Sequence, residues 1–377
     1  MKKQTNYILI IVTAVLLLFL TVASIIKPDV RMSENENRYL TKAPDLDIDD
    51  ILDGSFEEQL EEYLSDQIIG RESWIKLTTG SMKALGSRDA NGVFFLRNGG
   101  LAERITHSDF NYSRFFRNLE SVSELRESLE DEDINLDMIL VPTSAYSYKY
   151  DQNLSTNFNE DLAIAAADKV LGDTLIDLRE DLLSGGEKEY YFRTDHHWNY
   201  SGAEKAYEAY IRRVKGTEPI KHEPETLTDE FRGTLYSKVL LDNGTDEISI
   251  PSGSTAIPME VTIEDKTYDS IYFMDRLDKK DKYEVFFGGN YDRVDIELKD
   301  KGAVERPKLL IVKDSYANSF VPFILEDFGT ITMVDTRYFR GSVKDLAIEG
   351  NYDRVLILYN TNNFSQEKMS LTSKLLQ

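Results

Sequence analysis

The stretch that decides the fold is Leu309-Leu310-Ile311-Val312-Lys313-Asp314-Ser315-Tyr316-Ala317. Consecutive apolar residues followed by charged ones are typical of a buried strand that ends at the edge of a sheet. A helix is predicted from Ala317 to Asp327, so Ser315 lies in a strand-to-helix turn. Such a turn presents a side chain at the carboxyl edge of an open α/β sheet, where sites usually lie. Ser315 is therefore a candidate nucleophile, and an ordinary helix N-cap is the alternative.

The same alternation of apolar strands and amphipathic helices continues on both sides of this stretch and predicts an α/β fold. Ser201 and Glu204 form a capping-box pattern at the start of one helix. Lys308 to Val312 and Arg354 to Tyr359 are expected to be parallel neighbours, which places Ser315 and Asn360 at one edge. The other predicted elements are strands at Leu136–Val141, Leu175–Leu178 and Thr330–Val334, helices at Asn111–Asp131 and Ser201–Val214, helical turns within Phe56–Ile75, and a hairpin at Gly92–Leu101.

Composition changes along the chain indicate five segments. Residues from about 231 to 306 show short alternating runs between Gly, Asn and Asp turns, which indicates a β-rich insertion. The segments are a cytoplasmic tip with a transmembrane anchor at 1–27, a stalk (polar from Met32 to Asp50) with N-terminal helices and a hairpin at 28–105, the first part of the core at 106–230, the β-rich insertion at 231–306, and the second part of the core at 307–377.

The first residues predict export. Lys2 and Lys3 precede an uncharged stretch from Tyr7 to Ile26. At ~1.5 Å per helical residue this stretch is about 30 Å long, one bilayer core. Basic residues before the span set the N-terminus inside and the folded part in the extracellular or periplasmic space. A signal peptide cleaved near Val22-Ala23-Ser24 is the alternative, and it also exports the chain.

Charge and composition exclude several classes of function. The formal net charge of -23 argues against a nucleic-acid partner, because phosphates would be repelled. The chain contains no cysteine, which excludes disulfides, zinc-thiolate sites and cysteine nucleophiles. No cofactor is expected.

Any histidine-dependent mechanism must use one of only four residues, His107, His196, His197 and His222. Two of them stand in Asp195-His196-His197-Trp198, ahead of the capped helix. A carboxylate two residues before an imidazole can accept its ring N–H and stabilise the imidazolium of a general base. A helix-entry loop is one alternative. A metal site is another, but adjacent histidines on extended chain face opposite ways and no further cluster completes a ligand set.

Two further strand ends carry polar candidates. Ser144 follows the strand at Leu136–Val141 and is a weaker candidate nucleophile, because no clear helix start comes after it. Asn360 follows Tyr359, and a side-chain amide at this edge is a candidate oxyanion donor. Asparagines in an ordinary turn are the alternative interpretation.

The motif Asp195-His196-His197-Trp198, with Tyr191 to Thr194 before it and Ser201-Gly202-Ala203 after it, resembles the signature of the DHHW protein family. That family is related to the SGNH-like acetyltransferases of alginate O-acetylation. Other segments that fall in the expected order are Glu36-Asn37-Arg38, Tyr63 to Gln67 with Arg71, Asn91-Gly92-Val93, Val141-Pro142-Thr143, Gly233 to Lys238, and Asp314-Ser315-Tyr316.

The resemblance implies an SGNH-hydrolase-like α/β/α fold in three layers. In this fold Asp195 orients the imidazole of His197, His197 is the base and Ser315 is the nucleophile. His196 occupies the variable position between Asp195 and His197. The chain departs from ordinary SGNH hydrolases at Lys313, where they have Gly, and it shows no glycine oxyanion block. Neighbouring candidates for substrate contacts are Trp198, Tyr316 and Arg193.

The function implied is transfer of an acetyl group through an acyl-enzyme to a hydroxyl of a surface or secreted polysaccharide. The expected partner is a multi-pass membrane-bound O-acyltransferase that brings the acetyl group across the membrane. An esterase with water as acceptor would use the same chemistry. A non-catalytic glycan-binding or assembly factor is the alternative of a different class, with the β-rich region at 231–306 as its sugar platform.

Overall fold

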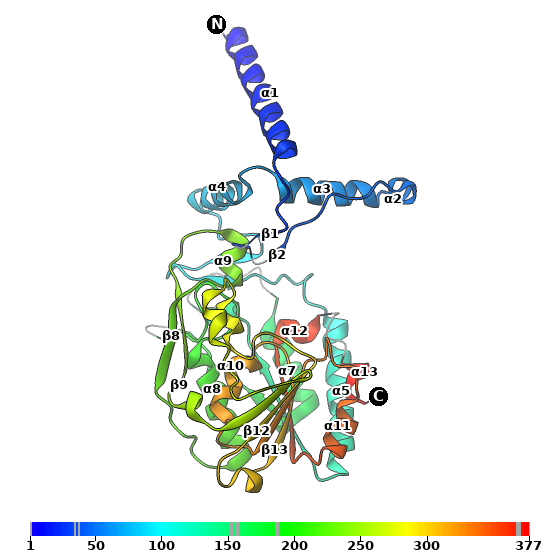
Figure 1. The fold of residues 1–377 in the computed structure, drawn as a ribbon, viewed down its shortest axis with the longest axis vertical. Helices are drawn as coiled ribbons and strands as arrows, with labels where there is room; N and C mark the ends of the chain where they lie inside the picture. Colours follow the sequence, from blue (N-terminus) through cyan, green and yellow to red (C-terminus); the bar gives the residue numbers. More distant parts are fainter. Residues whose placement is uncertain are drawn as a thin grey trace. The chain divides into compact units, whose positions relative to one another are not determined.

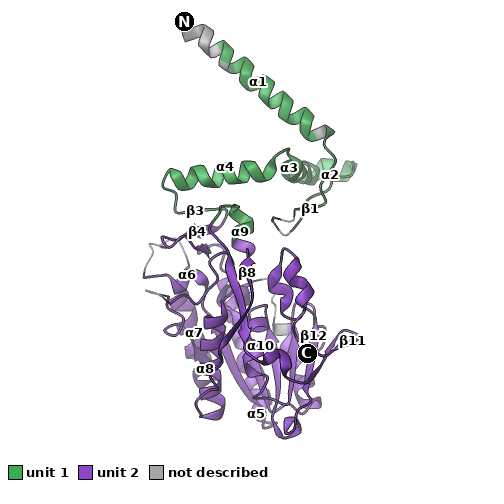
Figure 2. Cartoon of the chain, turned by 60° about the vertical axis from the view of Figure 1, so that its left-hand side comes forward, with its two compact units in different colours: residues 1–91, 236–242 green, residues 92–235, 243–377 purple. Residues whose placement is uncertain are grey.

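A computed structural model describes residues 2–33, 35–36, 38–150, 154, 158–184, 188–366 and 371–376. The chain divides into two compact units. Unit 1 comprises residues 1–91 and 236–242, and unit 2 comprises residues 92–235 and 243–377 (Figure 2). The boundaries predicted at residues 105 and 230 fall inside unit 2.

Unit 1 is mainly helical. Its elements are α1 (Lys2–Ile26), β1 (Met32–Ser33), β2 (Arg38–Tyr39), α2 (Ile48–Asp53), α3 (Ser55–Gln67), α4 (Arg71–Ala84) and β3 (Asp89–Ala90). The helices predicted within Phe56–Ile75 are α3 and the start of α4. The segment predicted as a stalk forms the antiparallel pair β1–β2, because buried Asp66 accepts hydrogen bonds from Arg38 and from the Thr41 amide.

The anchor predicted over Tyr7 to Ile26 is not confirmed. Among the residues that the structure describes, no helix combines the length and the apolar character needed to span a bilayer.

Unit 2 carries the central sheet. Its strands are β4 (Val93–Phe95), β5 (Leu101–Glu103), β6 (Asn135–Val141), β7 (Leu175–Asp177), β8 (Pro224–Phe231), β9 (Asp246–Pro251), β10 (Met259–Ile263), β11 (Lys266–Tyr268), β12 (Arg293–Leu298), β13 (Lys308–Lys313), β14 (Thr330–Val334) and β15 (Arg354–Asn360). Its α-helices are α5 (Tyr112–Glu130), α6 (Ser144–Ser147), α7 (Glu160–Leu171), α8 (Tyr200–Lys215), α10 (Ala317–Ile324), α11 (Val343–Glu349), α12 (Thr361–Ser365) and α13 (Thr372–Leu375), while α9 (Thr234–Val239) begins in unit 2. The 3-10 helices are η1 (Gly172–Thr174), η2 (Ser254–Ala256), η3 (Met274–Asp278), η4 (Lys282–Val285) and η5 (Ala303–Glu305).

Within the described part of the chain, the sheet has eight strands in the order β11-β10-β12-β14-β13-β15-β6-β7. The five strands from β14 to β7 are parallel, whereas β12, β10 and β11 add antiparallel pairs. The predicted parallel pairing of β13 with β15 is confirmed, with Leu310 opposite Val355. The carboxyl ends of β13, β15 and β6 therefore lie at one edge, and Ser315 follows the first of them.

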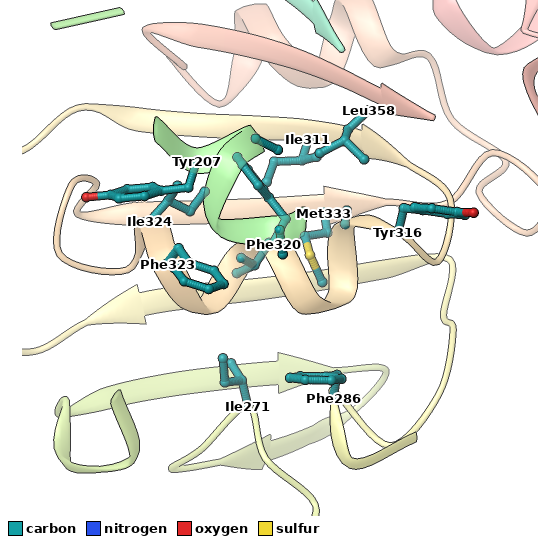
Figure 3. Packing of buried hydrophobic residues seen from close by; sticks show 14 of the residues in the cluster. Tyr207, Ile271, Phe286, Ile311, Tyr316, Phe320, Phe323, Ile324, Met333 and Leu358 are labelled. Atoms are coloured by element: carbon teal, nitrogen blue, oxygen red, sulfur yellow. The ribbon is translucent and has the colours of Figure 1, made fainter. Parts of the chain in front are cut away.

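Helices cover both faces of the sheet, with α8 and α10 on one side and α5 and α11 on the other (Figure 1). Side chains alternate along each strand, so Ile311 packs toward α10 and Leu310 toward α5. Every residue of α10 is buried. Figure 3 shows Phe320 of this helix in the same cluster as Ile311 and Met333. This packing fixes the helix that directly follows Ser315.

Two local predictions need correction. The helix predicted from Ser201 begins at Tyr200, and its cap is Asn199, whose Oδ1 accepts from the Gly202 amide at 3.1 Å. The predicted cap at Ser201 is thus two residues too late. Strands β9 to β12 lie within the segment predicted as a β-rich insertion, but β10, β11 and β12 extend the central sheet.

Candidate active site

The strand β13 ends at Lys313, and the chain turns through Asp314 and Ser315 into α10. Asp314 is fully buried, whereas Ser315 is partly exposed. The Asp314 carboxylate accepts from the Tyr316 amide at 2.9 Å and, through its other oxygen, from the Asn360 amide at 2.8 Å. Asp314 therefore ties the serine turn to the end of β15 and holds Ser315 at the open edge.

The histidines come from a loop between Tyr191 and Trp198, which pair as an antiparallel bridge. The Phe192 amide donates to the His197 carbonyl at 3.1 Å. At the base of this loop, the buried Asp246 carboxylate accepts from the Arg193 and Thr194 amides at 2.7 and 2.8 Å. The hydrogen bonds of the loop's backbone groups therefore hold its conformation independently of the contacts among the catalytic side chains.

Ser315, His197 and Asp195 form one hydrogen-bonded row. The Ser315 Oγ lies 2.7 Å from His197 Nε2, and His197 Nδ1 lies 2.6 Å from Asp195 Oδ1. A carboxylate can only accept, so Nδ1 carries the proton and the Nε2 lone pair accepts from the serine hydroxyl. The structure thus brings together the three residues predicted as the site, although His197 and Ser315 are 118 positions apart in the chain.

Burial sets the protonation states of this row. It lowers the pKa of His197 to about 4, helped by the neighbouring His196 and opposed by Asp195. Burial alone would raise the pKa of Asp195, but the two imidazoles and the hydrogen bonds from His197 outweigh it and hold that pKa below its usual range. At neutral pH the row therefore contains a carboxylate, a neutral imidazole and a hydroxyl, which is the resting state that general-base catalysis needs.

Gly233 and Thr234 enclose the outer oxygen of Asp195. The Thr234 amide donates to Asp195 Oδ2 at 2.7 Å, and the Thr234 hydroxyl donates to it at 2.9 Å. A Cβ on Gly233 would lie 2.2 Å from that oxygen, so only glycine permits this approach. Gly233 and Thr234 belong to the motif run quoted above, but the sequence did not indicate their role.

Tyr283, from the 3-10 helix η4, lies flat against the catalytic imidazole. Its ring centroid is 4.0 Å from that of His197, with an interplanar angle of 12°. Its hydroxyl donates to the Ser315 carbonyl at 3.0 Å and lies 3.0 Å from Ser319 Oγ. Tyr283 thus holds both the base and the serine turn, and no sequence signal identified it.

A buried lysine lies beside the nucleophile turn. Lys313 Nζ donates to the side-chain oxygens of Asn290 and Asn318, both at 2.8 Å. Burial lowers the Lys313 pKa to about 8. Lys313 thus connects the end of β13 with the loop at Asn290.

The predicted oxyanion role of Asn360 has no support in this geometry. Its Nδ2 donates to the Val141 carbonyl at 3.2 Å, and its Oδ1 accepts from the Asn362 amide at 3.0 Å. Asn360 lies at the same edge as Ser315, but both ends of its side-chain amide are already used. It caps α12 because the chain must turn there.

The three predicted substrate contacts also lie elsewhere. Trp198 is fully buried, and its indole N–H donates to Ser319 Oγ at 2.9 Å. Tyr316 is 1% exposed and donates to the His196 carbonyl at 2.5 Å. Arg193 reaches the Asn98 carbonyl and Glu189. Trp198 and Tyr316 are thus buried residues that support the site, and Arg193 binds the loop that contains Asn98.

Asp195, His196 and His197 could in principle approach one metal ion, because one ligand atom of each lies within 4.8 Å of the others. Their inward atoms are committed to one another, to Thr234 and to Ser315. An ion would have to displace those hydrogen bonds. The donor set therefore fits a hydrogen-bonded row better than a metal centre.

Comparisons with known proteins give a family match and a distant relative. Residues 165–334 match the DHHW protein family. A curated relative, the probable alginate O-acetylase AlgJ of Pseudomonas fluorescens, is 28% identical over 120 residues, which are 30% of each chain. That alignment leaves most of the relative's length unmatched.

Two solved structures share the fold. A DHHW family protein from Eubacterium siraeum superposes with a TM-score of 0.61 at 23% identity, covering 74% of this chain and 97% of that one. Bacillus cereus PatB1, solved with a sulfonyl adduct, superposes with a TM-score of 0.60 at 18% identity, covering 74% and 97%. The segment at residues 165–334 that matches the DHHW family includes Asp195, His197 and Ser315.

Proposed function

We propose that this chain is an extracytoplasmic serine O-acyltransferase that moves an acetyl group onto a hydroxyl of a polysaccharide. The observation that carries the proposal is the hydrogen-bonded row of Ser315, His197 and Asp195. Hydrolysis of the same acyl-enzyme by water would be the esterase reaction. The roles of the three residues are part of the proposal.

In the first half-reaction, Ser315 Oγ attacks the carbonyl carbon of an acyl donor while His197 Nε2 takes the hydroxyl proton. Asp195 stabilises the imidazolium that forms. The bond to the donor's leaving group then breaks, and His197 returns the proton to that group. The product is an ester between the acyl group and Ser315.

In the second half-reaction, a sugar hydroxyl attacks this ester and gives its proton to His197 Nε2. Collapse of the tetrahedral intermediate breaks the bond to Ser315 Oγ, which recovers the proton. Acyl groups and protons balance, and the enzyme returns to its starting state.

The negative oxygen of each intermediate needs a donor. The first-turn amides of Tyr316, Ala317 and Asn318 are bonded to Asp314 and to the Ser315 carbonyl. Among the described residues, the Ser315 N–H has no such partner. We assign it as the first oxyanion donor.

Similarity to AlgJ and the SGNH-like layering of helices on both sides of the sheet support the polysaccharide O-acetyltransferase class. The membrane-bound O-acyltransferase partner comes from the same resemblance. The extracytoplasmic location rests on Lys2 and Lys3 before the uncharged stretch Tyr7 to Ile26, a pattern of export in either of its forms.

The test is turnover of an activated acetyl ester with and without an oligosaccharide acceptor. The wild type should release the leaving group, and acetylated sugar should appear when the acceptor is present. Ser315→Ala should do neither. A folded wild type that hydrolyses no ester and acetylates no acceptor would instead favour a glycan-binding or assembly role.

A further inference from the structure

His196 lies at the open side of the row and has no part in the mechanism above. Its side chain is 25% exposed, against 7% for His197 and 2% for Asp195. Its ring centroid is 4.0 Å from that of His197, with an interplanar angle of 36°. A substrate that reaches Ser315 can therefore also reach this second imidazole.

Its tautomer follows from its partners. His196 Nδ1 lies 2.7 Å from the Thr234 hydroxyl oxygen, and that hydroxyl lies 2.9 Å from Asp195 Oδ2. Thr234 has one hydroxyl proton, and the carboxylate can only accept, so Thr234 donates to Asp195 and accepts from His196. The neutral His196 ring is thus protonated at Nδ1, and its Nε2 holds a lone pair.

This lone pair is free to accept. His196 Nε2 has no hydrogen-bond partner among the described residues. Both imidazoles direct Nδ1 toward Asp195, at 3.5 Å for His196 and 2.6 Å for His197. His197 Nε2 lies next to Ser315, and the 4.0 Å contact between the two ring centroids keeps the His196 imidazole beside it.

We propose that His196 Nε2 binds the acceptor sugar by accepting a hydrogen bond from the hydroxyl next to the one being acylated. His197 then takes the proton of the attacking hydroxyl, while His196 holds its neighbour. Vicinal hydroxyls on a sugar ring are one C–C bond apart, a spacing that two imidazoles in contact serve together. The preferred acceptor is therefore a vicinal diol.

This inference rests on the proposed function, and it adds selectivity for the acceptor. Water and a simple alcohol offer no second hydroxyl, so they gain nothing from His196. A diol gains one hydrogen bond in the transition state of deacylation, which is worth about fivefold to tenfold in rate. His196 thereby favours transfer to sugars over hydrolysis.

The test measures how the acyl-enzyme divides between two probe acceptors, a vicinal cyclohexanediol and cyclohexanol, after acylation by an activated acetyl ester. Wild type should prefer the diol about tenfold or more, which is the gain from the hydrogen bond multiplied by the statistical factor of two. In His196→Asn the amide N–H can still donate to Thr234, but the acceptor at Nε2 is gone, so the preference should fall to about the statistical value of two. His196→Gln, which places an amide near the Nε2 position, should recover part of it.

His107→Asn is the matched control, because His107 is bonded to Tyr112 and lies outside the row. It should keep the wild-type preference. An unchanged preference in His196→Asn would overturn the inference, since a purely structural role would lower both rates together and leave their ratio intact. A wild type with no ester turnover would overturn the proposed function itself.

Discussion

At the carboxyl end of β13, Ser315 is partly exposed and its hydroxyl meets the base His197. At the carboxyl end of β6, in the same sheet, Ser144 is 1% exposed and its Oγ accepts from the Glu103 amide at 3.2 Å. Both serines follow parallel strands with buried side chains. The difference shows that a strand end only offers a position for a nucleophile, and that a second loop must supply the base.

A buried carboxyl group lies near each of these two serines. Asp195 is bonded to an imidazole and keeps its charge. Glu160, 2% exposed, receives the Thr143 amide and hydroxyl at 2.8 and 2.7 Å. Burial raises the Glu160 pKa to about 7 in spite of these hydrogen bonds. The donors from Thr143 therefore do not offset the cost of burying the Glu160 carboxylate, whereas Asp195 receives the His197 amide and Nδ1–H together with the amide and hydroxyl of Thr234.

The largest expected effect separates the two serines. Ser315→Ala should lower turnover of an activated acetyl ester by about 10⁴, and His197→Ala and Asp195→Ala should cost roughly 10³ or more without adding to it, because triad members act as a unit. Ser144→Ala should leave kcat/KM within about twofold. Thermal unfolding of each variant controls for folding. Activity that depends on Ser144 rather than Ser315 would reverse the comparison.

Gly233→Ala should come next, with a loss of about 10² or more in kcat/KM. The new Cβ would lie 2.2 Å from Asp195 Oδ2, so the carboxylate or the loop must move. Gly80→Ala is the matched control, because its Cβ would meet Leu241 at an ordinary 3.8 Å. Wild-type activity in Gly233→Ala would show that the outer oxygen of Asp195 needs no fixed position.

The carboxyl group at the β6 end predicts a pH effect on stability. The folded Glu160 pKa is raised from 4.5 to about 7, so the stability it contributes is full below pH 4.5 and is lost as the pH rises to about 7. Glu160→Gln should remove this component, which is on the order of 3 kcal/mol between the two limits. Urea unfolding at several pH values measures it, and parallel pH curves for the two proteins would contradict it.

Tyr283→Leu should lower kcat/KM about tenfold, because the stacked ring keeps His197 in line with Ser315. Tyr283→Phe retains the ring and loses only the hydroxyl contacts, so it should stay within about threefold of the wild type. Equal losses in both variants would assign the role to the hydroxyl instead.

The smallest effect on ester hydrolysis is expected for His196→Ala, at less than about tenfold. His196 reaches Asp195 through Thr234, whose amide still donates to that carboxylate when the ring is gone. A larger loss in His196→Ala than in His197→Ala would show that the base has been assigned to the wrong ring.

Strands and site residues were predictable from sequence where the signal is local. The apolar runs at Leu309–Val312 and Leu136–Val141 lie on a buried sheet whichever residues pair with them. Asp195 and His197 stand two positions apart, so their hydrogen bond needs only a short loop. The adjacent charged and aromatic residues made this loop conspicuous.

The supporting contacts were not predictable because they join distant positions. Thr234 meets Asp195 across 39 residues, and Tyr283 comes from a segment interpreted only as a β-rich insertion. Trp198 and Asn360 were misjudged for a different reason. A polar or aromatic side chain near a site packs within the site as often as it contacts the substrate. For Trp198 and Asn360, only their hydrogen bonds in the structure distinguish these two roles.

The most direct test of the central claim is covalent labelling with a sulfonyl fluoride, located by peptide mass spectrometry. The sulfonyl group should be found on Ser315 and not on Ser144, and labelling should nearly disappear in His197→Ala. Labelling should also fall as the pH drops through about 4, because the pKa of His197 is lowered to about 4 and the ring becomes protonated there. Labelling of another serine, or equal labelling of Ser315 without His197, would contradict the assignment of this row as the catalytic centre.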